Sequence, residues 1–512
     1  MHERRSHRNR RHPEGGFRQL AILGAVLATL LAGSGCSHDA RPNVILVTLD
    51  TTRADFLGAY GKAGDPTPSL DALAREGTRF DLAISSAAVT PVSHASILTG
   101  LENPGHGLRV LSAPSGYRLH PDVPTLATVL RDRGYKTGAV GSAFPVSSYF
   151  GFANGFDSFQ GVEGELKDGA DGKTWNVAEL QRRSDATTEL ALEFLKSTTS
   201  PRFLWIHYWD PHDGVLVPPK DRLPKTLWRK GAEGEPEPSR DLYQAEVSYV
   251  DTQFGRLVAA LRERGEWDRT IVVVVADHGE GLGDHGWDHH RILYQEEIRV
   301  PLIVRAPGLR QQPSVADVVR TTDIYPTVLD VLGIPSPKPV SGRSLRPLIE
   351  GREDEPRIAF ADQINGFDWN ARMAVEHPQY DFLYCALDRE WKLIYRPSMP
   401  SKSELFRIAD DPLEKSNLYA SQPDESRRLL LELARYDGWV TAPFPPEKDS
   451  SRGSASIQSA LSAIGYAGGS DAPPGAPPRW VWICPNHPQD RSTERRPCAT
   501  CGSKRVLVSA NQ

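Results

Sequence analysis

The residues that could carry chemistry stand at the ends of apolar runs. The run VILVTL ends on Asp50, and the run IVVVVA ends on Asp277 and His278. Buried carboxylates cost free energy unless they are paired or bind a cation, so we expect these three residues to hold a divalent metal ion. Carboxylates mixed with imidazole suit zinc or manganese, and calcium, which prefers oxygen ligands alone, is the weaker alternative.

A loop of unusual composition supports this reading. The stretch DHGEGLGDHGWDHH, which begins at Asp277, holds four histidines and four acidic residues in fourteen positions. Capping of strand ends and turns would explain any one of these residues taken alone. The whole stretch instead indicates a metal or catalytic site.

A hydroxyl group stands at a predicted helix start in the segment AAVTPVSHASILTG. Pro91 fits the first turn of a helix that ends at Gly100, which predicts Thr90 at the N-cap. The positive end of the helix dipole would favour an alkoxide and a bound anion there, and metal coordination would lower the pKa of the hydroxyl further. Thr90 is therefore a candidate nucleophile and metal ligand, although a Thr at an N-cap often serves only as a cap.

Buried strands alternate with amphipathic stretches from Pro42 onward. Apolar runs predict strands at residues 44–49, 203–206, 271–276 and 302–304. Amphipathic stretches predict helices at residues 69–76, 125–133, 185–196 and 243–264. This order predicts an α/β fold with a central, mostly parallel sheet flanked by helices. Ligands of such sheets bind beyond the carboxyl ends of the strands, where Asp50, Asp277 and His207 would lie.

Composition bounds the class of protein. The 512 residues are 39% hydrophobic and 24% charged, which excludes a wholly disordered, fibrous or polytopic membrane protein. A formal net charge of -5 gives no reason to expect a nucleic-acid partner. Five cysteines in so long a chain cannot form a disulfide framework.

The N-terminus has the features of an export signal. Basic residues fill MHERRSHRNRRH, an apolar run follows at 20–32, and small residues precede Cys36. The run is short for a membrane span, which needs about 20 apolar residues. We expect residues 1–36 to be a signal peptide of the lipoprotein type. Cys36 would then carry the lipid anchor, and this anchor would be the protein's only contact with the membrane. An ordinary signal peptide is the alternative, and either one predicts an exported, periplasmic or cell-envelope protein of a bacterium.

The C-terminal part is predicted to be organised differently. The catalytic core would span 42–353, a smaller α+β subdomain 354–469, and a Pro/Gly linker 470–478. Residues 479–512 hold Cys484, His487, Cys498 and Cys501 at the spacing of a zinc ribbon. This module is too short for a core of its own, so a metal ion would supply its folding energy. A disulfide between Cys498 and Cys501, or a disordered tail, are the alternatives.

Six motifs resemble those of the sulfatase family of the alkaline phosphatase superfamily, over residues 42–469. They are NVILVTLDTTRADFLGAYG, TPSLDALAREGTRF, SHASILTG, ADHGEGLGDHG, LYQEEIRVPLIVRAPG and ELFRIADDPLEKSNLY. The resemblance implies the family's central sheet, its C-terminal subdomain, and metal-assisted displacement at a sulfate or phosphate ester. The tail is similar to a short heavy-metal-binding module, with Asn486 and Ser503 where that module has Met.

The resemblance also implies roles for single residues. Asp50, Asp277 and His278 match metal ligands, and Thr90 matches the nucleophile. By the same resemblance, His207 and His212 would contact the substrate anion or the leaving group. His289 would be the general acid, with the neighbouring His290 as its rival. A second metal ion held by Asp210, His212 and His289 is a further alternative.

The departures from the family pattern bear on the substrate. Sulfatases carry a Cys or Ser that is oxidised to formylglycine, but Thr90 stands at that place, His94 replaces the pattern's Arg, and Thr51 replaces the second Asp. A phosphoryl group on Thr can be released by water or an alcohol, because charge on its oxygens is stabilised electrostatically. We therefore expect hydrolysis or transfer of a small-molecule, lipid-linked or glycan-linked phosphate ester, with a diester favoured. A sulfate ester is the alternative substrate, and a catalytically silent, metal-stabilised binding protein is the alternative of another class.

Overall fold

The computed structural model describes residues 41–109, 118–162, 180–212, 216–227, 239–287, 289, 291–352, 355–364, 381–436 and 480–510. The predicted signal segment with Cys36, the linker 470–478 and His290 lie outside the described residues. The chain divides into two units, Met1–Arg41 and Pro42–Gln512, and every helix and strand described here belongs to the second.

An eight-stranded sheet with the order β4-β3-β5-β1-β6-β7-β2-β8 forms the centre of the fold. Its strands are β1 (Asn43–Leu49), β2 (Thr78–Ile84), β3 (Lys136–Val140), β4 (Ser158–Gln160), β5 (Arg202–Tyr208), β6 (Thr270–Ala276), β7 (Arg299–Arg305) and β8 (Ser314–Arg320). β5, β1 and β6 are parallel neighbours, and every residue in them is buried. Only β7 runs antiparallel to its neighbours, so the predicted, mostly parallel α/β sheet is confirmed.

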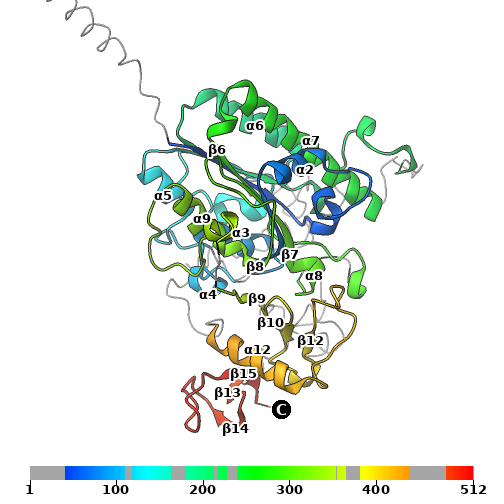
Figure 1. Cartoon of the computed structure of the whole chain (residues 1–512), viewed down its shortest axis with the longest axis vertical. Coiled ribbons are helices and arrows are strands. Elements are labelled where there is room, and N and C mark those ends of the chain that lie inside the picture. The colour runs from blue at the N-terminus through cyan, green and yellow to red at the C-terminus, as the bar shows by residue number, and fades with distance from the viewer. Residues whose placement is uncertain are drawn as a thin grey trace, which may run out of the picture. The chain divides into compact units, whose positions relative to one another are not determined.

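Helices cover both faces of this sheet (Figure 1). α2 (Pro68–Glu76), α6 (Ser184–Ser197) and α7 (Arg240–Glu263) lie on one side, and α3 (Thr90–Thr99), α5 (Leu126–Asp132) and α9 (Ile324–Val331) on the other. The short helices are α4 (Asn103–His106), α8 (Gln295–Ile298) and α10 (Arg346–Ile349). The four helices predicted from amphipathic stretches correspond to α2, α5, α6 and α7, and the helix predicted to end at Gly100 corresponds to α3.

A second, antiparallel sheet with the order β12-β11-β10-β9 follows the core. It consists of β9 (Ala359–Ile364), β10 (Phe382–Leu387), β11 (Lys392–Tyr395) and β12 (Glu404–Phe406), and α12 (Pro423–Arg435) packs against it. Asp362 of β9 joins this layer to the core, because it accepts hydrogen bonds from Asn103 (3.1 Å), Arg109 (2.7 Å) and the Tyr436 hydroxyl (2.7 Å). The small α+β layer expected from the sequence is thus present.

The tail forms a three-stranded sheet of β13 (Trp480–Cys484), β14 (His487–Ser492) and β15 (Val506–Ser509), with β13 in the middle. The tail was expected to be too short for a core of its own, and its buried apolar residues indeed belong to a cluster shared with the neighbouring subdomain. Val506 and Val508 are buried in a cluster with Leu433 of α12, which lies beside the tail sheet in Figure 1. Burial on a neighbouring layer supplies the apolar contacts that the short tail lacks by itself.

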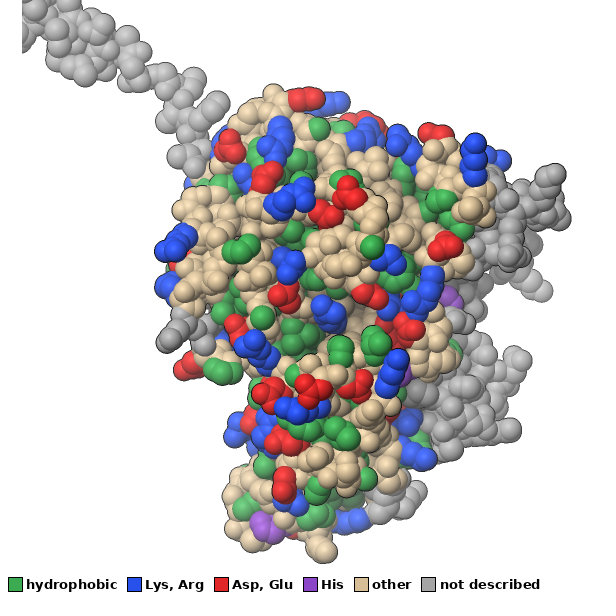
Figure 2. Space-filling model, turned by 45° about the vertical axis from the view of Figure 1, so that its right-hand side comes forward, with side chains coloured by type: hydrophobic (Ala, Val, Ile, Leu, Met, Phe, Trp, Pro, Cys, Tyr) green, Lys and Arg blue, Asp and Glu red, His purple; other side chains and the backbone are tan. Residues whose placement is uncertain are grey.

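The surface mixes charges of both signs. On the face in Figure 2, Lys and Arg side chains are interspersed with Asp and Glu. Within the described parts of the chain, no helix combines the length and the apolar character that a membrane span requires.

Candidate active site

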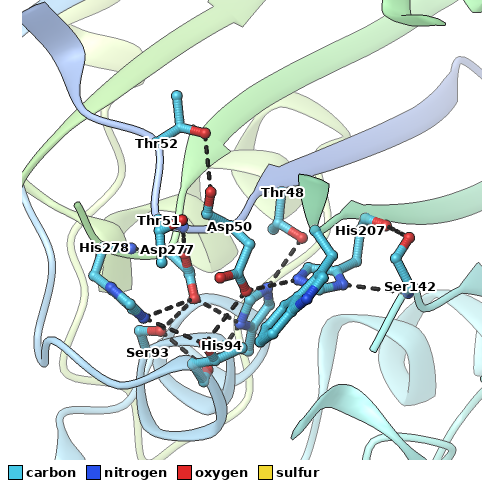
Figure 3. Close-up of polar contacts among 12 residues, drawn as sticks. Thr48, Asp50, Thr51, Thr52, Ser93, His94, Ser142, His207, Asp277 and His278 are labelled. Atoms are coloured by element: carbon cyan, nitrogen blue, oxygen red, sulfur yellow. Dashed lines mark hydrogen bonds and ion pairs between the residues drawn. The ribbon is translucent and has the colours of Figure 1, made fainter. Parts of the chain in front are cut away.

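The candidate site lies at the carboxyl ends of the three adjacent strands β5, β1 and β6 (Figure 3). Asp50 directly follows β1, and its amide donates to the Tyr208 carbonyl at the end of β5 (2.8 Å). Asp277 and His278 directly follow β6, and Thr48 and His207 are partners in the register of β1 and β5. Parallel strands end at one edge of a sheet, so residues more than 200 positions apart meet there.

The orientation of Asp277 is fixed by backbone amides. Its Oδ1 accepts hydrogen bonds from the amides of Thr51 (3.1 Å) and His278 (2.8 Å). Oδ2 lies 3.4 Å from the Ser93 hydroxyl and 3.5 Å from Nε2 of His278. One carboxylate oxygen is therefore held by the loop, while the other faces the cluster.

His278 presents a lone pair to the same cluster. Its Nδ1 lies 2.9 Å from the carbonyl of Gly279, which can only accept a hydrogen bond, so Nδ1 carries the proton. In the neutral ring, Nε2 is the nitrogen with the lone pair, and it lies 3.2 Å from Oγ1 of Thr90. This is the tautomer that a metal ligand requires, fixed by a hydrogen bond at the other ring nitrogen.

The donor set fits a divalent cation. Ligand atoms of Asp50, Asp277 and His278 lie within 4.8 Å of one another, and all three side chains are fully buried. Two buried carboxylates beside an imidazole are the donors that zinc or manganese accepts. Next to them, the buried hydroxyl of Thr51 makes no hydrogen bond within the described chain, which leaves a polar atom for an ion or its water to satisfy.

Helix α3 directs Thr90 into this cluster. The N-cap is Val89, in an extended conformation, and Thr90 is the first helical residue, so the prediction of Thr90 as N-cap is wrong by one position. Pro91 lies in the first turn and Gly100 ends the helix at φ 67°, as predicted. The Thr90 hydroxyl donates to Asp50 Oδ2 (3.3 Å).

His94 is a site residue whose role sequence reasoning missed. One turn after Thr90, its Nδ1 donates to the Thr90 carbonyl (2.8 Å), and its Nε2 accepts from the Thr48 hydroxyl (3.0 Å). Thr48 in turn accepts a hydrogen bond from Nε1 of Trp205 (3.0 Å). Burial lowers the pKa of His94, which agrees with a neutral ring whose two nitrogens are both satisfied. His94 thus connects the start of α3 to β1.

His207 contacts a candidate ligand rather than an open site. Its Nε2 donates to Asp50 Oδ2 (2.9 Å), and its Nδ1 accepts from the Ser142 amide (3.3 Å). Burial, followed by the charges of neighbouring histidines, lowers the pKa of His207 well below its ordinary value. This geometry suits a residue that orients Asp50, and the contact to the substrate anion or leaving group that the resemblance implies stays a prediction.

The residues predicted for a second metal ion are not brought together. Among the described residues, the only other convergent ligand group is Cys484, His487, Cys498 and Cys501 in the tail. Asp210 instead accepts hydrogen bonds from the amide (2.8 Å) and hydroxyl (2.7 Å) of Ser184 at the start of α6. Burial raises its pKa to about 7.

The two histidines of that predicted set have separate surroundings. His212 stacks on Trp209 with ring centroids 3.9 Å apart. The side chain of His289 is 54% exposed, with Nδ1 3.7 Å from a carboxylate oxygen of Glu280. The general-acid role of His289 stays a prediction.

Comparisons with known proteins find related sequences and structures. A model of the sulfatase family matches residues 42–334, and a model for the C-terminal part of N-sulphoglucosamine sulphohydrolase matches residues 283–434. The chain is 27% identical to an arylsulfatase of Clostridium perfringens, covering 77% of this chain and 94% of the relative. It is 25% identical to an N-acetylglucosamine-6-O-sulfatase of Bacteroides thetaiotaomicron, covering 81% and 90%. The crystal structure of a phosphonate monoester hydrolase of Agrobacterium radiobacter superposes with a TM-score of 0.58 at 23% identity, covering 76% and 94%, which shows the shared fold.

Proposed function

Because this chain belongs to the sulfatase family of ester hydrolases, we propose that it is a metal-dependent phosphate ester hydrolase with Thr90 as its nucleophile. One observation carries the proposal. Oγ1 of Thr90 lies 3.3 Å from Asp50 Oδ2 and 3.2 Å from His278 Nε2, inside the ligand set that fits a divalent cation. Asp50, Asp277, His278 and Thr90 would hold the ion.

In the proposed reaction, Oγ1 of Thr90 passes its proton to Asp50 and attacks phosphorus. The bond from phosphorus to the ester oxygen breaks, and His289, the predicted general acid, gives the leaving oxygen a proton. Asp50 Oδ2 already accepts the hydroxyl hydrogen of Thr90, so an acceptor for its proton is in place. Water or an alcohol then gives a proton to His289 and attacks phosphorus, the bond to Oγ1 breaks, and Thr90 regains its proton from Asp50. A bound divalent ion would stabilise the charge on the transferred group and favour the alkoxide of Thr90.

The side chain of Thr90 favours phosphate over sulfate. Threonine cannot be oxidised to the formylglycine aldehyde, so release of the group depends on a second attack on the ester that Thr90 forms. A phosphoryl group allows this attack when fixed dipoles and cations stabilise its equatorial oxygens. Thr90 begins the first turn of α3, at the positive end of the helix dipole, and this position favours a bound anion. We favour a diester or a phosphoryl transfer on these grounds.

The family relatives support an alternative substrate. An arylsulfatase and an N-acetylglucosamine-6-O-sulfatase are among them, so a sulfate ester on a small molecule or glycan is the second candidate. A silent binding protein, the third candidate, would keep the metal without turnover. We assign no part in ester chemistry to the tail, where zinc would serve folding. The basic and apolar start of the sequence supports export and a lipid anchor at Cys36.

A substrate panel tests the proposal. Purified protein without residues 1–36 is assayed with bis(p-nitrophenyl) phosphate, p-nitrophenyl phosphate and p-nitrophenyl sulfate under zinc, manganese and calcium. We expect the phosphate diester to be turned over fastest, with zinc or manganese. A preference for the sulfate would overturn the argument from Thr90, and metal binding without any turnover would support the binding protein.

A further inference from the structure

The tail carries a second set of convergent ligands. Cys484 ends β13, His487 begins β14, and Cys498 and Cys501 lie on the loop before β15. Their ligand atoms lie within 4.8 Å of one another, and Cys484 and Cys498 are buried. Three separate segments of the tail therefore meet at this group.

The distances between these atoms are those of a tetrahedral site. Sγ of Cys484 lies 3.6 Å from Sγ of Cys501 and 3.8 Å from Nδ1 of His487, which is 3.4 Å from Sγ of Cys498. Bonds of about 2.3 Å from zinc to sulfur and about 2.0 Å to nitrogen place tetrahedral ligands about 3.5 to 3.8 Å apart. A disulfide would need about 2.05 Å between sulfurs, so the spacing matches coordination through Nδ1 of His487.

We propose that Cys484, His487, Cys498 and Cys501 bind one zinc ion, and that this ion fastens the tail to the end of helix α12. The site shares no residue with the candidate active site, so the proposal is independent of the ester chemistry.

The surroundings of Cys501 favour zinc over copper. Asn486 Nδ2 lies 4.0 Å and Ser503 Oγ 3.3 Å from its Sγ, and these are the two positions where the similar module has Met. Amide and hydroxyl groups orient a thiolate and reduce its charge, whereas thioethers are soft ligands that select Cu(I). Gly502, at φ 70°, makes the turn after the second cysteine pair, with its amide donating to the Cys498 carbonyl (2.8 Å).

The loop closed by this ion reaches the subdomain. Arg495, between the two ligand pairs, donates to the carbonyls of Ala434 (3.0 Å) and Tyr436 (3.4 Å) at the C-terminal end of α12. The last carbonyls of a helix have no partner inside it, so Arg495 caps α12 from outside. β15 adds the apolar contacts of Val506 and Val508 with Leu433. A zinc ion that fixes the loop between the ligand pairs therefore also fixes Arg495 at the end of α12.

Metal content tests the site. Full-length protein purified without chelator is compared with Cys498→Ser and Cys501→Ser, and with Cys385→Ala, a buried thiol of β10 outside the ligand set. We expect each tail variant to lose one equivalent of zinc per chain and the control to lose none. Cobalt in the wild type should show thiolate-to-metal charge transfer that both tail variants lack. Retention of the zinc in the tail variants, or a disulfide among the tail cysteines of the purified wild type, would overturn the site.

Amide hydrogen exchange tests the fastening. We expect exchange at residues 430–436 and 506–509 to be about tenfold faster in Cys498→Ser than in Cys385→Ala, because the loop that carries the cap is released. Arg495→Ala should speed exchange at the end of α12 while it keeps its zinc. Unchanged exchange in a zinc-free Cys498→Ser protein would show that the ion does not fasten the tail.

Discussion

The hydroxyl oxygen of Thr90 lies 3.2 Å from Nε2 of His278, although 188 positions separate the two residues. The contact exists because Val89 takes the N-cap position of α3 and Thr90 begins the first turn. At the N-cap, the hydroxyl would be used to satisfy a backbone amide of its own helix. One position later it becomes available to the carboxylates and the imidazole at the ends of β1 and β6.

Removal of this hydroxyl should abolish turnover and leave the metal in place. We expect Thr90→Ala to lower kcat at least about a thousandfold, since the nucleophile is lost while Asp50, Asp277 and His278 remain. Thr90→Ser should keep measurable activity. Thr99→Ala, at the other end of α3, is the matched control and should retain wild-type rates. Turnover by Thr90→Ala near the wild-type rate would exclude Thr90 as the nucleophile.

His94 should affect catalysis through the position of Thr90. We expect His94→Ala to lower kcat about tenfold to a hundredfold with little change in KM, because a displaced nucleophile weakens attack more than binding. His94→Asn can still donate to the Thr90 carbonyl and should recover part of the loss. Equal effects of the two variants, or an effect on KM alone, would speak against a positioning role.

The buried ion pair between Lys392 and Glu414 should be sensitive to loss of one partner. Nζ and Oε1 lie 2.7 Å apart and both side chains are fully buried. Lys392→Met leaves an uncompensated carboxylate and should lower the free energy of unfolding by about 3–5 kcal/mol, measured by urea denaturation. The double variant with Glu414→Gln removes both charges and should be more stable than the single variant. A double variant at least as unstable as Lys392→Met would contradict this account.

Asp251 should make stability depend on pH. Its carboxylate accepts hydrogen bonds from the amides of Ser69 (3.1 Å) and Leu70 (2.7 Å) at the start of α2. Burial raises the pKa of Asp251 from 3.8 to about 6. Between these values the folded state holds a proton that the unfolded state has lost. The free energy of unfolding should therefore fall by about 3 kcal/mol as the pH rises through this window.

The pH effect is measured as a difference between variants. Urea denaturation of the wild type and of Asp251→Asn at pH 4 and pH 7 should show the extra loss in the wild type only. Asp221→Asn, at an exposed position, is the control and should follow the wild type. Parallel pH profiles for the wild type and Asp251→Asn would show that Asp251 makes no such contribution.

The metal preference of the tail should change with the two residues beside Cys501. Replacement of Asn486 and Ser503 by Met exchanges polar groups for soft thioethers, so we expect a lower ratio of zinc to Cu(I) affinity than in the wild type. Competition with chromophoric chelators for each metal measures this ratio. The Asn486→Gln/Ser503→Thr protein, which keeps polar groups, is the control. An unchanged ratio in the Met variant would show that Asn486 and Ser503 do not determine the preference for zinc.

The central strands could be predicted because both of their faces are buried. β1, β5 and β6 each contain an unbroken apolar run, and the predicted ranges lie inside the observed ones. β2 and β8 escaped prediction because partly exposed and polar residues interrupt them, as in TRFDLAI. The antiparallel direction of β7 depends on its partners and leaves no signal in a short apolar run.

The candidate site was predicted where residues follow strands. Asp50, Asp277 and His278 converge because their strands are neighbours, and Thr90 was marked by Pro91 and the family pattern. The role of His94 could not be predicted, because a single histidine within a helix does not indicate that its ring contacts the Thr48 hydroxyl on β1. The docking of the tail on α12 likewise depends on hydrogen bonds from Arg495 to the carbonyls at the end of that helix. No pattern in the sequence predicts these bonds.

The buried carboxylate of Asp362 holds the C-terminal sheet against the core. Groups from α4, from the segment after it and from the end of α12 all converge on this one buried carboxylate. Hinge closure of the kind used by two-lobed enzymes would have to break an ion pair and two hydrogen bonds and leave a charge without its partners. We therefore expect the central sheet and the C-terminal sheet to keep the same arrangement in the free and substrate-bound states.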